Sequence, residues 1–255
     1  MTISLDQIKS LRDLTGVSIT ACKKALEEAG GDQDKAIEYL RKRGEAKALE
    51  RADRETGEGA IAYAQADGKL AICALTCETD FVSKSPEFIT AAQEIANEIL
   101  AKGAETDFTS TVTELSTKMG EKVELKSVAV LEGSVLGAYV HSNNKIAAAI
   151  QLEGGTEEVA RDVAMHVSAS NPTVLSPTEV DASAVAKEAV IWNDELTKSG
   201  KPETIWSKIL EGKEAKFRNE NALLSQSFVK NPEHTVEQFV AQSGGKVVKY
   251  VSVRI

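Results

Sequence analysis

The chain has 255 residues, of which 42 % are apolar, 27 % charged and only 5 % aromatic, and its formal net charge is −9. Such a composition is typical of a folded globular protein, and this length allows more than one folded unit with a core of aliphatic side chains. Binding to nucleic acid in general relies on basic residues that neutralise phosphates. The acidic balance therefore argues against direct binding of nucleic acid.

Targeting and redox features favour a cytoplasmic protein. No stretch approaches the roughly 20 apolar residues of a membrane helix, so we expect no membrane partner. The first ten residues lack both the pattern of a secretory signal and the Arg-rich character of a transit peptide. Cys22, Cys73 and Cys77 make an odd count with no disulfide framework, which fits reduced thiols.

Residues 1–44 are predicted to form three short helices. Ser4 and Gln7 make a capping box for the first helix, Ser18 caps the second and Asp32 caps the third. The apolar residues at helical spacing are Ile8, Leu11 and Leu14, then Ile19, Cys22, Ala25 and Leu26, then Ala36, Ile37 and Leu40. Such a small core and layout resemble a ubiquitin-associated (UBA) domain.

The middle of the chain contains an internal duplication. Residues 57–75 align without a gap with residues 133–151, at an offset of 76. Each copy reads as strand, two-residue turn and strand. Asp67–Gly68 favours a type I′ turn, and Asn143–Asn144 can adopt the same positive φ angles. A capped helix is predicted after each hairpin, with Ser85 as cap and Pro86 at the first helical position in the first copy and Thr156 as cap in the second. We therefore expect two copies of a hairpin-plus-helix unit.

A helical hairpin and a final strand are predicted in the C-terminal part. Two helices at about 181–222 are joined by a Gly-Lys-Pro tip, which indicates an antiparallel pair. The side chains expected to face inward are Ala186, Val190, Leu196, Ile205, Ile209 and Leu210. Trp192 and Trp206 either pack between the helices or are presented to a partner. Residues 246–255 alternate as a last strand.

These elements predict an α+β fold. It has an N-terminal three-helix UBA-like module, a duplicated hairpin-plus-helix core with antiparallel sheets, and a protruding antiparallel helical hairpin. The predicted parts are the module 1–44, a charged and solvated linker 45–56, a core subdomain 57–132, and a second core subdomain 133–255 that carries the helical hairpin.

The sequence offers no support for catalysis. His141, His166 and His234 are isolated, and Cys73 and Cys77 alone do not make a zinc site. No phosphate-binding loop, dinucleotide fingerprint or nucleophile elbow is present. We therefore expect no catalytic residue, no metal and no cofactor. Cys22 precedes two lysines, which can activate a thiol, but its helical spacing turns it inward.

Two segments carry a family resemblance, and two more extend it. Residues 11–44, LRDLTGVSITACKKALEEAGGDQDKAIEYLRKRG, and residues 74–84, ALTCETDFVSK, closely resemble the two signature regions of the elongation factor Ts family. Residues 130–141 and 164–172 look like that family too. The resemblance covers nearly the whole chain in the right order. It implies a guanine-nucleotide exchange factor for elongation factor Tu that performs no covalent chemistry.

The resemblance also implies roles for particular residues. The N-terminal module docks on the GTPase domain of elongation factor Tu, and the residues carried over are Leu11, Arg12, Thr15, Gly16, Lys23 and Lys24. Asp80 and Phe81, framed by Thr79 and Val82, intrude between helices of that domain and disturb the site of Mg²⁺ and the nucleotide phosphates. His141, Met165 and His166 are candidates for contact with another domain of the partner.

Some positions depart from the family pattern. Ala74 and Thr76 stand where relatives typically have an acidic residue and often Asn, which affects how the strand is held. Some relatives continue into a C-terminal helix with a further partner contact, which we do not expect in a chain that stops at Ile255. The oligomeric state stays open, with a homodimer through complex formation as one alternative.

Without the family, other interpretations of the same residues compete. A Phe between a buried strand and a helix cap usually packs into the core, which would make Phe81 a core residue and Asp80 a turn residue. Two other functions also compete. One is a UBA-like adaptor acting through residues 3–44, and the other is a thiol-dependent enzyme using Cys22 or Cys77.

Overall fold

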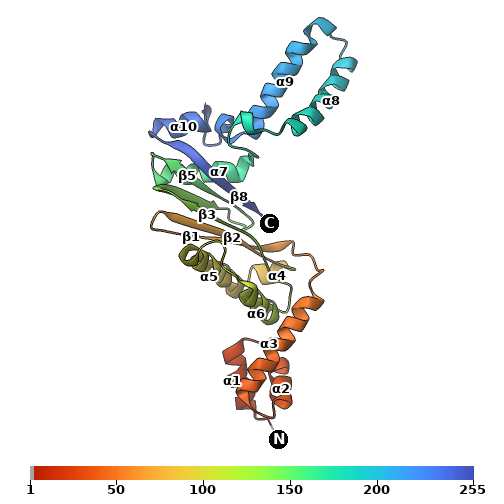
Figure 1. Cartoon of the computed structure of the whole chain (residues 1–255), viewed down its shortest axis with the longest axis vertical. Coiled ribbons are helices and arrows are strands. Elements are labelled where there is room, and N and C mark those ends of the chain that lie inside the picture. The colour runs from red at the N-terminus through yellow and green to blue at the C-terminus, as the bar shows by residue number, and fades with distance from the viewer. Residues whose placement is uncertain (1–2) are drawn as a thin grey trace. The chain divides into compact units, whose positions relative to one another are not determined.

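The computed structural model describes residues 3–255, except for the side chains of residues 45, 46, 48 and 49 in the third helix (Figure 1). Residues 1 and 2 of the predicted module lie outside the described residues. Three N-terminal helices and small antiparallel sheets with further helices confirm the predicted α+β class. The chain divides into two compact units, one of residues 1–62, 73–128 and 255, the other of residues 63–72 and 129–254.

The first unit begins with helices α1 (Leu5–Thr15), α2 (Ile19–Glu28) and α3 (Gln33–Glu50). The capping box at Ser4 and Gln7 is confirmed, and the Ser18 side chain accepts from the Ala21 amide. The small core that they share contains Ile8, Leu11, Cys22, Ala25, Leu26, Ala36 and Leu40. The prediction was wrong for Leu14 and Ile19, which are exposed. A module this small leaves part of each apolar stripe uncovered.

The first hairpin consists of β1 (Glu58–Ala66) and β2 (Lys69–Cys77), and its turn is confirmed. Asp67 and Gly68 both have positive φ angles, 49° and 72°, as a type I′ turn requires. Helices α4 (Asp80–Ser83), α5 (Pro86–Lys102) and α6 (Thr109–Met119) follow. Strand β3 (Glu124–Glu132) then completes a sheet in the order β1-β2-β3.

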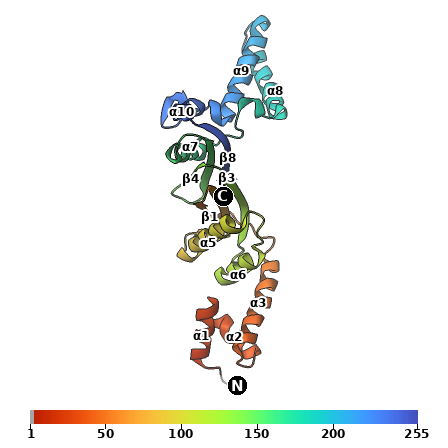
Figure 2. The same cartoon turned by 60° about the vertical axis from the view of Figure 1, so that its left-hand side comes forward.

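The second unit contains the second copy. Strands β4 (Val135–Val140) and β5 (Ile146–Glu153) pair antiparallel, and β8 (Lys246–Arg254), the predicted last strand, pairs with β5. Helix α7 (Glu157–Ser170) covers one face of this sheet (Figures 1 and 2). The expected two-residue turn at Asn143–Asn144 was wrong. Only Asn144 has a positive φ, because the loop is wider and the His141 amide donates to the Ile146 carbonyl at its base.

The predicted helical hairpin is formed by α8 (Ala182–Lys198) and α9 (Trp206–Asn221), which lie side by side in both views of Figures 1 and 2. Leu196 is buried as predicted, and Ile209 and Leu210 are half-buried. The prediction was wrong for Ala186, Val190 and Ile205, which are exposed, whereas Val185 and Trp192 are buried. Trp192 packs edge-on against Phe217 with ring centroids 5.9 Å apart, which supports a packing role for this residue. A two-helix layer covers only one stripe of each helix, so several apolar side chains remain exposed.

Further short elements complete the second unit. Between α7 and α8 lies η1 (Pro177–Glu179), and η2 (Glu203–Ile205) precedes α9. After α9 come η3 (Leu223–Ser225), the paired strands β6 (Ser227–Phe228) and β7 (Asn231–Thr235), and α10 (Val236–Gln242). Phe228 and Phe239 stack with centroids 4.0 Å apart and join the core under the β4-β5-β8 sheet.

Candidate functional site

The candidate site is the tip Thr79–Val82, at the end of the first hairpin. Strand β2 is buried up to Cys77, and the chain then leaves the sheet and forms the short helix α4. Phe81 is 86 % exposed, whereas Thr79, Asp80 and Val82 are half-buried. The alternative that Phe81 packs into the core is therefore wrong. A Phe side chain exposed to this extent buries little apolar area and therefore adds little to the stability of the fold.

Asp80 carries the negative charge of the tip. Its carboxylate lies 2.7 Å from the Lys84 ammonium group, one helical turn away. The hydrogen bond from Lys84 to Asp80 raises the pKa of the lysine. Lys84 is exposed and Asp80 is half-buried, so water reaches this ion pair and weakens it, and a partner can replace it.

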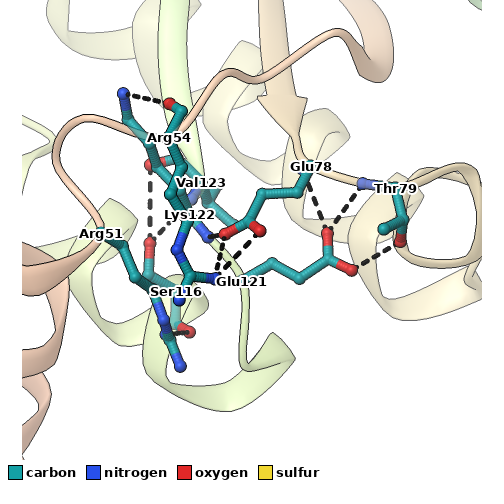
Figure 3. Close-up of polar contacts among 8 residues, drawn as sticks. All are labelled: Arg51, Arg54, Glu78, Thr79, Ser116, Glu121, Lys122 and Val123. Carbon is teal, nitrogen blue, oxygen red and sulfur yellow. Dashed lines mark hydrogen bonds and ion pairs between the residues drawn. The ribbon is translucent and has the colours of Figure 1, made fainter.

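The base of the tip is held by an acidic side chain from a distant part of the chain, as Figure 3 shows. The Glu121 carboxylate accepts hydrogen bonds from the amides of Glu78 and Thr79, at 3.1 and 3.0 Å, and from the Thr79 hydroxyl at 2.5 Å. Three donors of two consecutive residues therefore converge on one carboxylate. Thr79 occupies the N-cap position of α4, but its side chain makes no cap bond to that helix and its hydroxyl donates to Glu121.

Glu78 makes the reciprocal contacts to the neighbouring segment (Figure 3). Its carboxylate accepts from the Lys122 amide at 2.6 Å and from the Arg54 guanidinium at 3.0 and 3.1 Å. The hydrogen bond from the Lys122 amide lowers the pKa of Glu78 most, and the hydrogen bond and positive charge of Arg54 lower it further. The Lys122 ammonium in turn donates to the carbonyls of Ala52 and Arg54. The stretch 45–56, expected to be a solvated linker, therefore contributes to the support of the tip.

The strand before the tip is held by a further chain of hydroxyl groups. Thr76 is fully buried, and its hydroxyl donates to that of Thr56 at 3.0 Å, which donates to the Glu124 carboxylate at 3.1 Å. Thr76 is one of the two departures from the family pattern, and the other, Ala74, is also buried. Thr76 therefore holds the end of β2 through hydrogen bonds, although it differs from the residue that the family pattern has at this position.

Residues of the N-terminal module predicted to bind a partner lie in two environments. Leu11 is fully buried in the module core, and Thr15 is half-buried, with its hydroxyl donating to the Leu11 carbonyl at 2.7 Å. Gly16 ends α1 with a φ of 64°, a conformation that favours glycine. Gly16 is exposed, as are Arg12, Lys23 and Lys24. Leu11 and Thr15 therefore shape the module from inside, Gly16 ends a helix at its surface, and the three cations form part of that surface.

The candidates from the second copy are likewise divided. His141 is exposed, and its Nδ1 lies 3.0 Å from the Tyr139 hydroxyl. Met165 is half-buried. His166 is fully buried, where Nδ1 accepts from the Val229 amide at 3.1 Å and Nε2 donates to Gln226 at 2.9 Å. Burial lowers the pKa of this histidine, so the ring is neutral and its surface is covered by protein.

The thiols do not form a reactive site. Cys22, Cys73 and Cys77 are buried and free. Burial raises the pKa of Cys73 to about 12, and burial with the nearby Glu121 charge raises the pKa of Cys77 to about 12. A nucleophilic cysteine needs an accessible thiolate, which these two side chains do not provide. Among residues 3–255, no cluster of three or more His, Cys, Asp and Glu side chains is placed to hold a metal ion.

No helix within the described part of the chain is long and apolar enough to cross a membrane.

The sequence motif located the tip but missed its support, since Glu121, Lys122 and Arg54 were not predicted. The sequence contains no local signal for them, because Glu121 lies 42 residues from Thr79 and acidic residues are frequent throughout.

Comparison with known proteins defines the class. A sequence model of the family described as Elongation factor TS matches residues 78–255. The chain is 41 % identical over 269 aligned positions to elongation factor Ts from Aeromonas hydrophila subsp. hydrophila, covering 99 % of this chain and 90 % of that protein. It is also 41 % identical over 266 positions to elongation factor Ts from Francisella tularensis subsp. novicida, covering 99 % and 92 %. The chain belongs to the elongation factor Ts family, whose members are translation elongation factors.

Proposed function

We propose that this protein is a guanine-nucleotide exchange factor that binds elongation factor Tu loaded with GDP and accelerates release of the GDP. The proposal rests on family membership together with one observation, the exposure of Phe81 at 86 % on a firmly held tip. Burial of such a side chain in a partner provides roughly 1.5–3 kcal/mol. That free energy is available to separate helices of the partner only if the ring is exposed beforehand.

In the proposed mechanism, the N-terminal module docks first on the GTPase domain of the partner. The exposed Leu14 and Ile19 and the cations Arg12, Lys23 and Lys24 support such a docking surface. Apolar side chains exposed next to charged ones are typical of protein interfaces. His141 and the segment around Met165 contact another domain of the partner. His166 is buried and does not touch the partner, and its role is to hold the surrounding backbone in place.

The tip then acts on the nucleotide site. Phe81 enters between helices of the GTPase domain, and Asp80 exchanges its ion pair with Lys84 for donors near the metal site. Mg²⁺ neutralises the nucleotide phosphates, so disturbing its coordination weakens GDP binding. Because linkage is reciprocal, a factor that binds the empty partner more tightly than the loaded one lowers nucleotide affinity by the same ratio. No covalent bond changes, and the factor requires neither a cofactor nor a metal of its own.

The test is release of a fluorescent GDP analogue from elongation factor Tu in the presence of excess unlabelled GDP. We expect release to accelerate with the concentration of this protein and to reach a plateau. We also expect excess Mg²⁺ to oppose the acceleration, because the tip and the ion compete through one site. Absence of acceleration at micromolar concentration would contradict the proposal.

The same assay separates the alternatives. A UBA-like adaptor would bind the partner or another protein through residues 3–44 without changing the release rate. A thiol-dependent activity would be lost after treatment with an alkylating reagent. We expect the exchange activity to survive that treatment in the folded protein, since all three cysteines are buried.

A further inference from the structure

The helix that carries the tip is too short to hold its own position. Helix α4 has only four residues, and its N-cap, Thr79, makes no side-chain bond to it. Isolated helical turns are unstable in water because each fixes several residues for few hydrogen bonds. The direction of Asp80 and Phe81 must therefore be set from outside α4.

Glu121 supplies that external support. Its two carboxylate oxygens accept from the last two amides before α4 and from the Thr79 hydroxyl, all within 3.1 Å. Hydrogen bonds to an ionised acceptor are roughly twice as strong as those between neutral groups. With both amides and the hydroxyl bound to one group, residues 78 and 79 cannot rotate independently of Glu121.

Glu121 is itself fixed by the turn that follows α6. Gly120 ends α6 with a φ of 78°, and its amide bonds to the Ser116 carbonyl. The buried Ser116 hydroxyl accepts from the Val123 amide at 2.9 Å, which closes the turn on the other side of Glu121. Arg51, the residue after α3, donates a hydrogen bond to the Ser116 carbonyl at 3.0 Å (Figure 3). Glu121, which we call the anchor, is therefore held by hydrogen bonds of the residues on both sides of it in the chain.

We propose that Glu121 is a positioning residue for nucleotide exchange, which orients the tip through Thr79 and the Glu78 amide without touching the partner's nucleotide. This inference rests on the proposed function. If the tip is already ordered before binding, less of the binding free energy is lost to ordering it. Loss of the anchor should therefore leave docking intact and slow the step in which the tip displaces Mg²⁺.

The variants isolate the anchor bond from its surroundings. Glu121→Ala removes all three acceptor contacts, and Glu121→Gln keeps the size but removes the charge. Thr79→Val removes the hydroxyl with little change of shape, whereas Thr79→Ser retains it. Glu114→Ala is the matched control, because this exposed carboxylate of α6 makes only a 3.9 Å ion pair with Arg41 and a long bond with Ser110.

The main readout is the dependence of GDP release on factor concentration. For Glu121→Ala and Thr79→Val we expect the plateau rate to fall about ten- to a hundredfold, as for other small losses of positioning, with an unchanged half-saturating concentration. Glu114→Ala should retain the wild-type plateau, Thr79→Ser should recover most of the rate that Thr79→Val loses, and Glu121→Gln should lie between Glu121→Ala and wild type. A merely destabilised protein would behave differently, because a smaller folded fraction raises the half-saturating concentration and leaves the plateau unchanged.

A second readout needs no partner. Hydrogen exchange of the Glu78 and Thr79 amides should become at least about tenfold faster in Glu121→Ala, whereas amides in α5 keep their protection. If wild-type protein accelerates release and both anchor variants share its plateau, this inference alone is overturned, even with faster amide exchange. If wild-type protein does not accelerate release, the proposed function fails and this inference fails with it.

Discussion

The two hairpin-plus-helix copies differ most at the connection between the second strand and the helix. Two residues, 154 and 155, separate β5 from Thr156, whereas seven residues, 78–84, separate β2 from Ser85. Thr156 and Ser85 have the same role, since each side chain accepts from the amide three residues later, Val159 or Phe88. The additional residues of the first copy form α4 and the exposed tip. One scaffold therefore occurs twice, and the segment that we propose to bind a partner is an insertion in one copy.

A threonine also appears in both connections with different roles. Thr79 and Thr156 have similar extended backbone angles at the N-cap position, with φ of −123° and −132°. Thr156 caps its helix, whereas Thr79 donates its hydroxyl to Glu121. The similar backbone conformation of the two threonines therefore does not determine the role of the hydroxyl. Its role depends on whether the fold places an acceptor such as Glu121 next to it.

The largest expected effect concerns Phe81 of the first connection and Phe88 of the helix α5 that follows it. Phe88→Ala should lower the free energy of unfolding by about 3–5 kcal/mol, because its side chain is completely buried. Phe81→Ala should change it by less than about 0.5 kcal/mol, as expected for an exposed position. Urea unfolding followed by circular dichroism measures both. Similar losses for the two variants would mean that Phe81 belongs to the core.

The next effect separates the two threonines. Thr156→Ala removes a helix cap and should lower the free energy of unfolding by about 1 kcal/mol, with no change in the plateau rate of GDP release. Thr79→Ala should lower the plateau rate instead. Thr156→Ser, which keeps the cap, serves as the control. A loss of exchange activity in Thr156→Ala, with the fold intact, would mean that the second connection also acts on the nucleotide site.

A smaller effect distinguishes the helices after the two hairpins by pH. All buried residues of α5 are apolar, whereas α7 buries His166, whose pKa is lowered below its ordinary value of 6.5. The unfolded chain therefore takes up a proton first as pH falls below 6.5, and stability decreases until the folded histidine is also protonated. Urea midpoints between about pH 8 and pH 5.5 should show this loss. His166→Gln should flatten the curve, and an unchanged slope would contradict the assignment.

The smallest effect belongs to the support of the tip. The pKa of Glu78 is lowered by its bonds from the Lys122 amide and Arg54, so its contribution is complete above the ordinary glutamate value of 4.5. This contribution is lost as pH falls through the lower folded value. Nuclear magnetic resonance titration of the Glu78 carboxyl should show a midpoint below the ordinary value of 4.5. A midpoint at or above that value would mean that the bonds do not persist in solution.

Local features of this fold could be predicted from the sequence because they depend on neighbouring residues. The Ser4 capping box, the Ser85–Pro86 helix start and the Asp67–Gly68 turn each require only a few adjacent side chains. The helix α6 was missed because its stretch of threonines and serines lacks a clear apolar stripe. The register of α8 and α9 was wrong because both helices carry more apolar residues than one contact stripe can bury.

The site shows the same limit. The Thr79–Val82 string was located through its resemblance to a family, and the exposure of Phe81 then excluded the core alternative. Glu121 could not be predicted, since its contact with Thr79 joins residues 42 positions apart. Long-range hydrogen bonds of this kind depend on the folded arrangement and leave no periodic pattern in the sequence.

An exposed phenylalanine on a firmly held tip drives nucleotide release in the mechanism that we propose, and Phe81→Ala tests this role most directly. The measurement is the plateau rate of fluorescent GDP release from elongation factor Tu with wild-type protein and with this variant, after equal unfolding midpoints have been verified. We predict that the wild-type protein accelerates release and that the variant loses about tenfold or more of the plateau rate, as 1.4 kcal/mol of lost contact would require. A fully folded Phe81→Ala protein with the wild-type plateau rate would contradict the account.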